Sequence, residues 1–338
     1  MNAAPLPNGW SDDASWLLQA IDPRARLVRL VRMDEAAYRA ASFLDDRMLH
    51  PGLEMRLCSL DQAMADADSL KREDARWIFH IGHVGSTLVS RLLGELDRTL
   101  SLREPRSLRD LLVANEDELP RFARNLRRVF SCSFSRSQRT IVKATSFVSE
   151  HAPLLVPPNG AALFLTASPE NYVAGILAGE YSVKELAAGF EIRTDRLRKR
   201  GIELAGFEAS LAHRAAAAWA CEMTSLEAAG EAMGDRRVLW ADFDIMLNDM
   251  AGGIKRCARH FDLKLAPRQA EQLANGPLMR RYSKALEYDY SPTLRAELLA
   301  DATRRHRLDI EAALTALRQA AKSAPLLERA LKRSGQEC

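Results

Sequence analysis

The stretch RWIFHIGHVGSTLVSRLLGEL, residues 76–96, decides the fold class. It predicts an apolar strand over 76–81, a tight turn at Gly82 and Gly85, and a helix over 86–96 with a buried leucine stripe. Glycine lets the backbone turn tightly, so the N–H groups of the turn and of the following helix N-terminus can surround an anion. The alternative is that the glycines only close a strand–helix turn. The hydroxyls of Ser86 and Thr87 favour the anion site.

The loop lacks the lysine of a nucleotide-hydrolysing phosphate loop. Such a loop reads G-x-x-x-x-G-K-[ST], and its lysine reaches the outer phosphates. Here Gly85 is followed directly by Ser86. Hydrolysis of ATP or GTP is therefore not expected, and Asp242, which follows a later apolar run, is expected to cap a helix rather than to hold magnesium.

Short apolar runs alternate with amphipathic segments from residue 76 onward. Strands are expected at 139–144, 161–167 and 236–243, in addition to 76–81. This alternation predicts a three-layer α/β/α fold with a mostly parallel central sheet and additional helices. Residues 1–72 are expected to be an N-terminal elaboration packed on the core, with one strand at 26–33 and no chemical motif. Residues 73–338 form the expected core domain with a helical C-terminal part.

The composition of the chain indicates no particular class of macromolecular partner. The 338 residues include 48 Lys plus Arg and 45 Asp plus Glu, a net charge of +3. This balance predicts neither a nucleic-acid nor a membrane partner. No segment approaches about 20 uninterrupted apolar residues, so no membrane span is expected. The 5 cysteines form no C-x-x-C pair and no zinc-type cluster, which indicates a reducing, cytoplasmic location and no metal site.

Several segments together resemble the sulfotransferase family, in particular its bacterial members. FHIGHVGSTLVSRLL is similar to the family's 5′-phosphosulfate-binding loop. SLREPRSLRDLL resembles its Glu-Pro segment, IVKATSF its next strand with a lysine, and AALFLTASPENYVAGIL its strand–turn–helix around a proline. RRVLWADFDIMLNDMAGGIKRCARHFDL resembles its late strand, acidic turn and helix. The matches follow the family's order and cover about residues 76–265.

The resemblance implies a P-loop NTPase-like fold and a donor, 3′-phosphoadenylyl sulfate (PAPS). It implies transfer of the sulfuryl group to a hydroxyl or amine of a small molecule, carbohydrate or lipid, without a metal. The loop suits this donor, because backbone N–H groups and hydroxyls can bind the 5′-phosphosulfate with no magnesium-held triphosphate. The residues implied to bind it are Gly82, His83, Gly85, Ser86, Thr87 and Leu88.

Three residues are candidates for catalysis. His83 takes the place of the family's basic loop residue and could stabilise charge on the leaving oxygen; it could equally be a loop histidine bonded to backbone. Glu104 is the candidate base for the acceptor proton, although it could instead pair with Arg103 or Arg106. Lys143 could face the donor's sulfate, or could simply be solvated at the strand end.

One segment departs from the family. The family places an arginine and a serine around its conserved proline to hold the 3′-phosphate, and here those positions are Ala167 and Gly175. Neither can make a charge-assisted contact. A late loop, LMRRYSKAL, offers Arg280, Arg281 and Lys284 as a substitute. The other basic run, EIRTDRLRKRGIE, is expected to be a solvated connection or a lid.

Two further hypotheses remain open. A P-loop phosphotransferase that uses another nucleotide would explain the missing 3′-phosphate pair, but the missing loop lysine opposes it. A non-catalytic relative that only binds an anion or nucleotide would explain the pair too, but the intact Gly-Ser-Thr loop opposes it. The sequence does not identify the acceptor or the oligomeric state.

Overall fold

The computed structural model describes residues 3–204 and 206–334. Its centre is a five-stranded parallel sheet of order β5-β6-β4-β7-β8. The strands are β4 (Arg76–His80), β5 (Thr99–Arg103), β6 (Arg139–Lys143), β7 (Ala162–Thr166) and β8 (Val238–Asp242). The predicted fold class, a mostly parallel sheet between helices, is confirmed. β5 was not predicted, because its sequence, TLSLR, is short and half polar.

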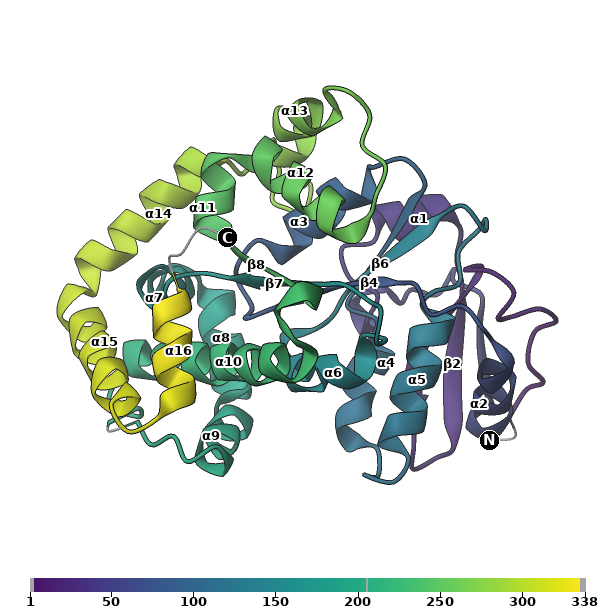
Figure 1. Ribbon diagram of the computed structural model, residues 1–338, viewed down its shortest axis with the longest axis horizontal. Helices are drawn as coiled ribbons and strands as arrows, with labels where there is room; N and C mark the ends of the chain where they lie inside the picture. Colours follow the sequence, from purple (N-terminus) through teal and green to yellow (C-terminus); the bar gives the residue numbers. More distant parts are fainter. Residues whose placement is uncertain (1–2, 205, 335–338) are drawn as a thin grey trace.

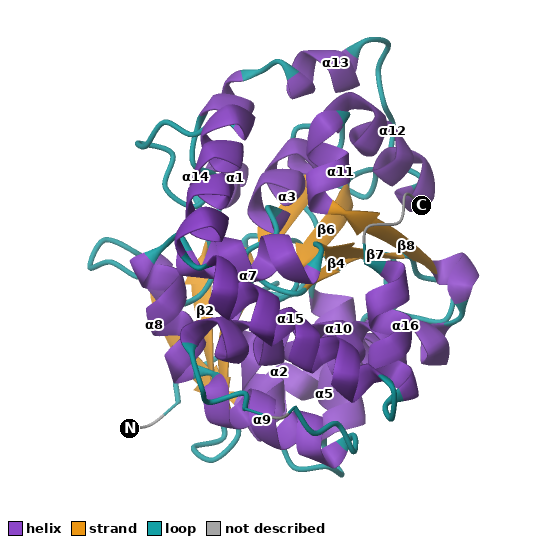
Figure 2. Cartoon of the chain, turned by 90° about the vertical axis from the view of Figure 1, so that its left-hand side faces the viewer, coloured by secondary structure: helices purple, strands orange, loops and turns teal. Residues whose placement is uncertain are grey.

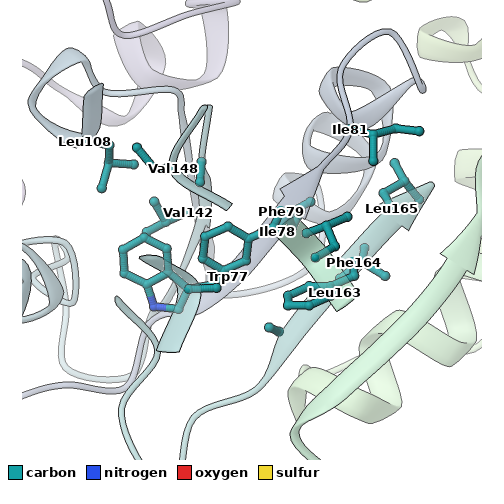
Figure 3. Close-up of a cluster of buried hydrophobic side chains, with 14 of the residues drawn as sticks. Trp77, Ile78, Phe79, Ile81, Leu108, Val142, Val148, Leu163, Phe164 and Leu165 are labelled. Carbon is teal, nitrogen blue, oxygen red and sulfur yellow. The ribbon is translucent and has the colours of Figure 1, made fainter. Parts of the chain in front are cut away.

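Helices cover both faces of this sheet (Figures 1 and 2). Helices α3 (Ser86–Gly94), α11 (Phe243–Asn248) and α12 (Met250–Phe261) lie on one side, and α6 (Ala152–Leu155) and α10 (Leu211–Met233) lie on the other. Figure 3 shows Trp77, Phe79 and Phe164 packed between the layers. These side chains are fully buried, as expected for parallel strands covered on both faces.

The N-terminal part forms a second, antiparallel sheet of order β1-β2-β3. Its elements are β1 (Trp16–Asp22), β2 (Leu27–Arg32), α1 (Glu35–Ala40), β3 (Met55–Ser59) and α2 (Leu60–Ser69). Of its three strands only β2 was predicted, whereas the helices that became α1 and α2 were expected from an Ala-rich stretch and from residues 60–70. The carboxylate of Asp110 accepts from the Ile21 N–H at 2.7 Å, and the Ser107 hydroxyl donates to the Leu18 carbonyl. This sheet therefore packs directly on the core, while a domain boundary at residue 72 stays a prediction.

The remaining helices follow the parallel strands or close the chain. They are α4 (Arg106–Asp110), α5 (Leu119–Val129), α7 (Pro169–Leu177), α8 (Glu180–Ala188), α9 (Phe190–Lys199), α13 (Gln269–Ala274), α14 (Pro292–Arg305), α15 (Arg307–Ala321) and α16 (Pro325–Arg333). Short 3-10 turns occur at Asp46–Met48, Leu111–Val113, Ser146–His151, Asp235–Arg237 and Pro277–Arg280. In Figure 1 the yellow C-terminal helices lie beside α7 and α10.

The expected solvated connection around residues 191–203 is wrong, because this segment forms α9 and packs on α10. Arg193 is buried and pairs with Glu222 of α10 at 2.9 Å. Arg196 and Arg200 both pair with Glu150. Dense basic runs are usually solvated, but here the buried Glu222 and the half-buried Glu150, from distant segments, hold three of the five cations.

Two compositional predictions can be compared with the structure only in part. Within residues 3–204 and 206–334, no helix is long and apolar enough to cross a bilayer. Cys58, Cys132, Cys221 and Cys257 are free thiols. The cytoplasmic location stays a prediction.

Candidate active site at the loop after β4

The loop between β4 and α3 has a concave backbone. Gly82, His83 and Gly85 all have positive φ, at 84°, 53° and 64°. Residues in this left-handed region, placed between ordinary ones, turn successive N–H groups toward one side, which is the backbone arrangement of anion-binding nests. The loop predicted from the sequence therefore has the geometry of an anion site.

The first turn of α3 has N–H groups that the described chain does not bond. The first intrahelical bond runs from the Val89 N–H to the Gly85 carbonyl at 3.1 Å. In the described ranges no side chain caps this helix, and its first turn carries no acidic residue. The N–H groups of Ser86, Thr87 and Leu88 are thus left for an external acceptor, at the end where the helix dipole favours negative charge.

A buried hydroxyl at the same place has no partner. Thr87 is 1% exposed, and its Oγ1 makes no hydrogen bond within the described residues. A buried unsatisfied hydroxyl is destabilising, by about 1–3 kcal/mol. Because an anion's oxygens are acceptors, an anion on this turn would satisfy both the hydroxyl and the uncapped amides.

His80 fixes the start of the loop. Its Nδ1 accepts from the Gly82 N–H at 2.9 Å, so the proton lies on Nε2, which donates to the Ala144 carbonyl at 2.9 Å. Burial, helped by the charge of Lys143, lowers the pKa of His80 to about 3. The imidazole is therefore neutral and ties the loop to the end of β6. His80 was not among the predicted site residues, although a histidine ending an otherwise apolar strand was the available signal.

Glu104 and Lys143 form a buried ion pair beside the loop. They end up together because Lys143 closes β6 and Glu104 follows β5, its neighbour in the sheet. The Glu104 N–H also donates to the Lys143 carbonyl at 2.8 Å. Burial alone would raise the pKa of Glu104, but Lys143 first, and also Arg47, lower it to about 2. Burial lowers the pKa of Lys143 despite Glu104.

A cavity of about 1640 Å³ opens onto the loop and the ion pair. All but one of the predicted site residues line it: Gly82, His83, Gly85, Ser86, Thr87, Leu88, Glu104, Lys143, Arg281 and Lys284. Arg280 does not line it; its carbonyl accepts from the Tyr290 N–H. The structure thus gathers these side chains, while their roles stay predictions.

His83 turns its ring toward α8. Its Nε2 lies 3.4 Å from Glu185 Oε2 and its Nδ1 lies 3.3 Å from the Ser182 hydroxyl. The hydrogen bond from His83 is the largest cause of a lowered Glu185 pKa. The imidazole is therefore bonded to side chains of α8, which differs from the backbone-bonded histidine considered above.

Of the late loop's two cations that line the cavity, Arg281 is already paired within the described residues and Lys284 is not. Arg281 pairs with Asp289 at 2.8 Å. Lys284 is half-buried and has no carboxylate within 4.0 Å in the described part of the chain. It is therefore the cation of this loop that is available to a bound anion.

The N-terminal part contributes side chains that sequence analysis did not find. Arg47 lies over the ring of Phe43, with Cζ 3.4 Å from the ring centroid, and its Nη2 lies 3.8 Å from Glu104 Oε2. Asp45 accepts from Arg47 at 2.6 Å. All three side chains line the cavity. No local motif marks them, because they reach the site through the packing of the N-terminal sheet.

The two departures from the family pattern occupy different surroundings. Ala167 is buried, and its carbonyl accepts from the Trp219 indole at 2.9 Å. Gly175 lines the cavity, and a Cβ placed on it would meet only Leu299, at 3.6 Å. Arg295 lines the cavity as well, but Asp244 holds its guanidinium at 2.8 Å.

In the described ranges no group of His, Cys, Asp or Glu side chains could hold a metal ion. Asp242 caps α11, since its carboxylate accepts from the Asp244 and Ile245 N–H groups at 2.9 and 3.1 Å. Its predicted capping role is confirmed.

Comparisons with known proteins give structural matches only. No family model and no curated sequence matches the chain. The matching solved structures include the sulfotransferase domain of the curacin biosynthetic pathway (10% identity, TM-score 0.41, 70% of this chain and 98% of that one). A sulfotransferase from Alicyclobacillus acidocaldarius matches at 14% identity and TM-score 0.39, over 72% of this chain and 97% of that one.

A mouse sulfotransferase complexed with PAP also matches, at 10% identity and TM-score 0.42, over 82% of this chain and 96% of that one. These matches belong to the family that the sequence motifs resemble. At such identities they report resemblance alone.

Proposed function

We propose that this chain is a sulfotransferase that moves a sulfuryl group from PAPS to a hydroxyl or amine. One observation carries the proposal: the uncapped first turn of α3 and the Glu104–Lys143 pair face the same large cavity. The turn supplies donors for an anionic group. The pair supplies a carboxylate for a proton and a cation for developing charge.

The proposed step is a single in-line displacement at sulfur. The acceptor oxygen or nitrogen forms a bond to sulfur while the bond from sulfur to the bridging oxygen breaks. The bonding electron pair stays on the 5′-phosphate, and the acceptor's proton passes to Glu104. The N–H groups of Ser86, Thr87 and Leu88 hold the phosphate, and catalysis comes from positioning and charge stabilisation.

Lys143 links the binding of the donor to the transfer of the acceptor's proton. With a pKa of about 2, Glu104 is a weak base in the unliganded chain, because an efficient base has a pKa closer to the working pH. An anion on the loop would compete with Glu104 for the ammonium of Lys143. Sharing that charge raises the pKa of Glu104, so donor binding itself would prepare the base.

Lys284 is the proposed substitute for the missing 3′-phosphate ligands. Ala167 and Gly175 cannot pair with phosphate. Lys284 lines the cavity without a carboxylate partner within the described residues, and Arg281 stands beside it. Removing Lys284 should therefore weaken ligands that carry a 3′-phosphate more than ligands that lack it.

Calorimetric titration with 3′-phosphoadenosine 5′-phosphate (PAP) tests the proposal. We expect the wild-type chain to bind, and Ser86→Ala/Thr87→Ala to bind at least about ten-fold more weakly, since hydroxyl contacts to a charged group are lost. Thr315→Ala/Ser323→Ala, exposed on or beside α15, is the matched control. Absence of wild-type binding at millimolar PAP would contradict the proposal.

A phosphotransferase that uses another nucleotide is the second candidate, and Ala167 and Gly175 are the observation that favours it. A bound ligand raises apparent stability with occupancy. Thermal melts with ATP and magnesium, compared with PAP, separate the two. A larger stabilisation by ATP and magnesium would favour the phosphotransferase.

A further inference from the structure

A second region of the cavity extends beyond Glu104, away from the loop. Small-molecule pockets usually measure about 300–1,000 Å³, and this cavity measures about 1640 Å³. One wall is α4 with the following turn, Leu111–Val113, and another wall is α9. Phe147 lies between them. We call this region the distal lobe, and the nucleotide-binding loop takes no part in it.

Both walls of the distal lobe present exposed apolar side chains. Val113 on one wall is 63% exposed and Ile192 on the other is 52% exposed. Leu111, Leu112 and Phe147 line the space between. Large apolar side chains on two walls of a cavity indicate an apolar ligand surface rather than scattered exposure.

Each wall also carries a cation without a carboxylate partner. Within the described residues neither Arg109 nor Lys199 makes an ion pair, and the Arg109 guanidinium lies over the Phe147 ring, 5.9 Å from its centroid. Most carboxylates that line the distal lobe already form ion pairs with arginines. They are Asp46, Asp110, Glu150 and Asp195. Glu116 also lines the cavity and is exposed. The two cations unpaired in the described chain, Arg109 and Lys199, are therefore the groups that complement a negative charge.

The order of these groups along one wall specifies the shape of the ligand. Glu104 lies two residues before α4, Arg109 lies within α4, and Val113 ends the 3-10 turn that follows it. A molecule in the lobe would thus place its reacting group at Glu104, an anionic group at Arg109, and an apolar body between Val113 and Ile192.

We infer that the acceptor is an anionic amphiphile: a molecule with a hydroxyl or amine next to an acidic group, and an apolar chain or ring system beyond it. This inference rests on the proposed function for the reacting group, but the binding site itself does not require catalysis.

Titration of the full-length chain with N-dodecanoyl-L-serine, below its micelle concentration and with PAP present, tests the inference. This probe carries a hydroxyl, a neighbouring carboxylate and an apolar tail. We expect it to bind, its uncharged methyl ester to bind at least about ten-fold more weakly, and N-acetyl-L-serine, which lacks the tail, to show no measurable binding. Equal binding of acid and ester, or no binding of the acid, overturns the inference.

Two double variants test whether the acid binds in the distal lobe. Arg109→Gln/Lys199→Gln removes two exposed side chains that make no hydrogen bond in the described chain, so it should fold. It should lower the affinity for the acid by about ten-fold and leave the ester unchanged. Arg304→Gln/Lys332→Gln, on α14 and α16, is the matched control. An unchanged affinity for the acid in the first variant overturns the inference.

The two proposals fail separately. A wild-type chain that does not bind PAP contradicts the sulfotransferase proposal, and the acid titration is then repeated without PAP. A chain that binds PAP but not the acid contradicts only the acceptor class.

Discussion

His80 shows how one buried side chain can hold a ligand loop in shape. Its ring accepts from Gly82 and donates to Ala144, so the loop and the end of β6 are linked by a neutral imidazole. This role depends on the protonation state, because a proton on Nδ1 would remove the acceptor for the Gly82 N–H.

The first prediction concerns pH. The pKa of His80 is about 3 in the folded chain and about 6.5 when unfolded, so below pH 6.5 the unfolded state binds the extra proton. Stability from this group is therefore present above pH 6.5 and is lost as the pH falls toward 3. Melting temperatures of wild type and His80→Gln, measured from pH 7.5 to 5, should converge. A constant difference contradicts the prediction.

The second prediction concerns the buried pair. Lys143→Met removes the closest cation from the buried Glu104 carboxylate, leaving only Arg47 at 3.8 Å, and should lower the free energy of unfolding by about 3 kcal/mol. Glu104→Gln/Lys143→Met should lose clearly less than the sum of the single variants, because no charge is left behind. Urea unfolding of the four proteins measures the coupling. Additive losses would show that the two groups do not interact.

At the scale of elements, the turn from β4 to α3 is packed against α11. A Cβ on Gly85 would lie 2.0 Å from Phe243 Cζ, and Gly85 has a positive φ as well. Two independent causes therefore require glycine at this position: the left-handed backbone conformation and the closeness of the Phe243 ring.

The third prediction separates these two causes. Gly85→Ala should lower stability by about 2–4 kcal/mol, combining left-handed strain with overpacking. Phe243→Leu removes the clashing ring atoms, so Gly85→Ala should be less destabilising in that background. Gly201→Ala is the control, since Gly201 has positive φ but no atom within 4 Å of its Cβ position. Equal losses in both Phe243 backgrounds would exclude the steric cause.

Local sequence predicted the elements whose patterns are strong. The strands at β4, β6, β7 and β8 and the glycine turn followed from apolar runs and from the Gly-Ser-Thr sequence. β5 was not predicted because its alternation of polar and apolar residues extends over only five residues. Local sequence could not predict that α9 packs on the core, because the carboxylates that pair with its arginines, Glu150 and Glu222, lie far away in the sequence.

At the scale of the whole molecule, the candidate site combines segments that no local pattern connects. Glu104 and Lys143 were singled out as separate residues, and only the sheet order makes them a pair. Phe43 and Arg47 were not predicted, because only the packing of the N-terminal sheet on α4 brings them to the cavity.

The fourth prediction follows from that packing. Residues from both sheets belong to one continuous buried cluster, and Ile21, Leu18 and Met64 bond to side chains of the core. We expect urea unfolding followed by far-UV circular dichroism and by tryptophan fluorescence to give one coincident transition. A separate early transition would show that the N-terminal part folds independently.

The proposed function depends most on the first turn of α3 as the binding site of an anionic donor. A crystal structure of the chain with PAP tests this directly. We predict that oxygens of the 5′-phosphate lie within hydrogen-bonding distance of the N–H groups of Ser86, Thr87 and Leu88. A phosphate bound elsewhere in the cavity, with this turn left unbonded, would contradict the proposed function.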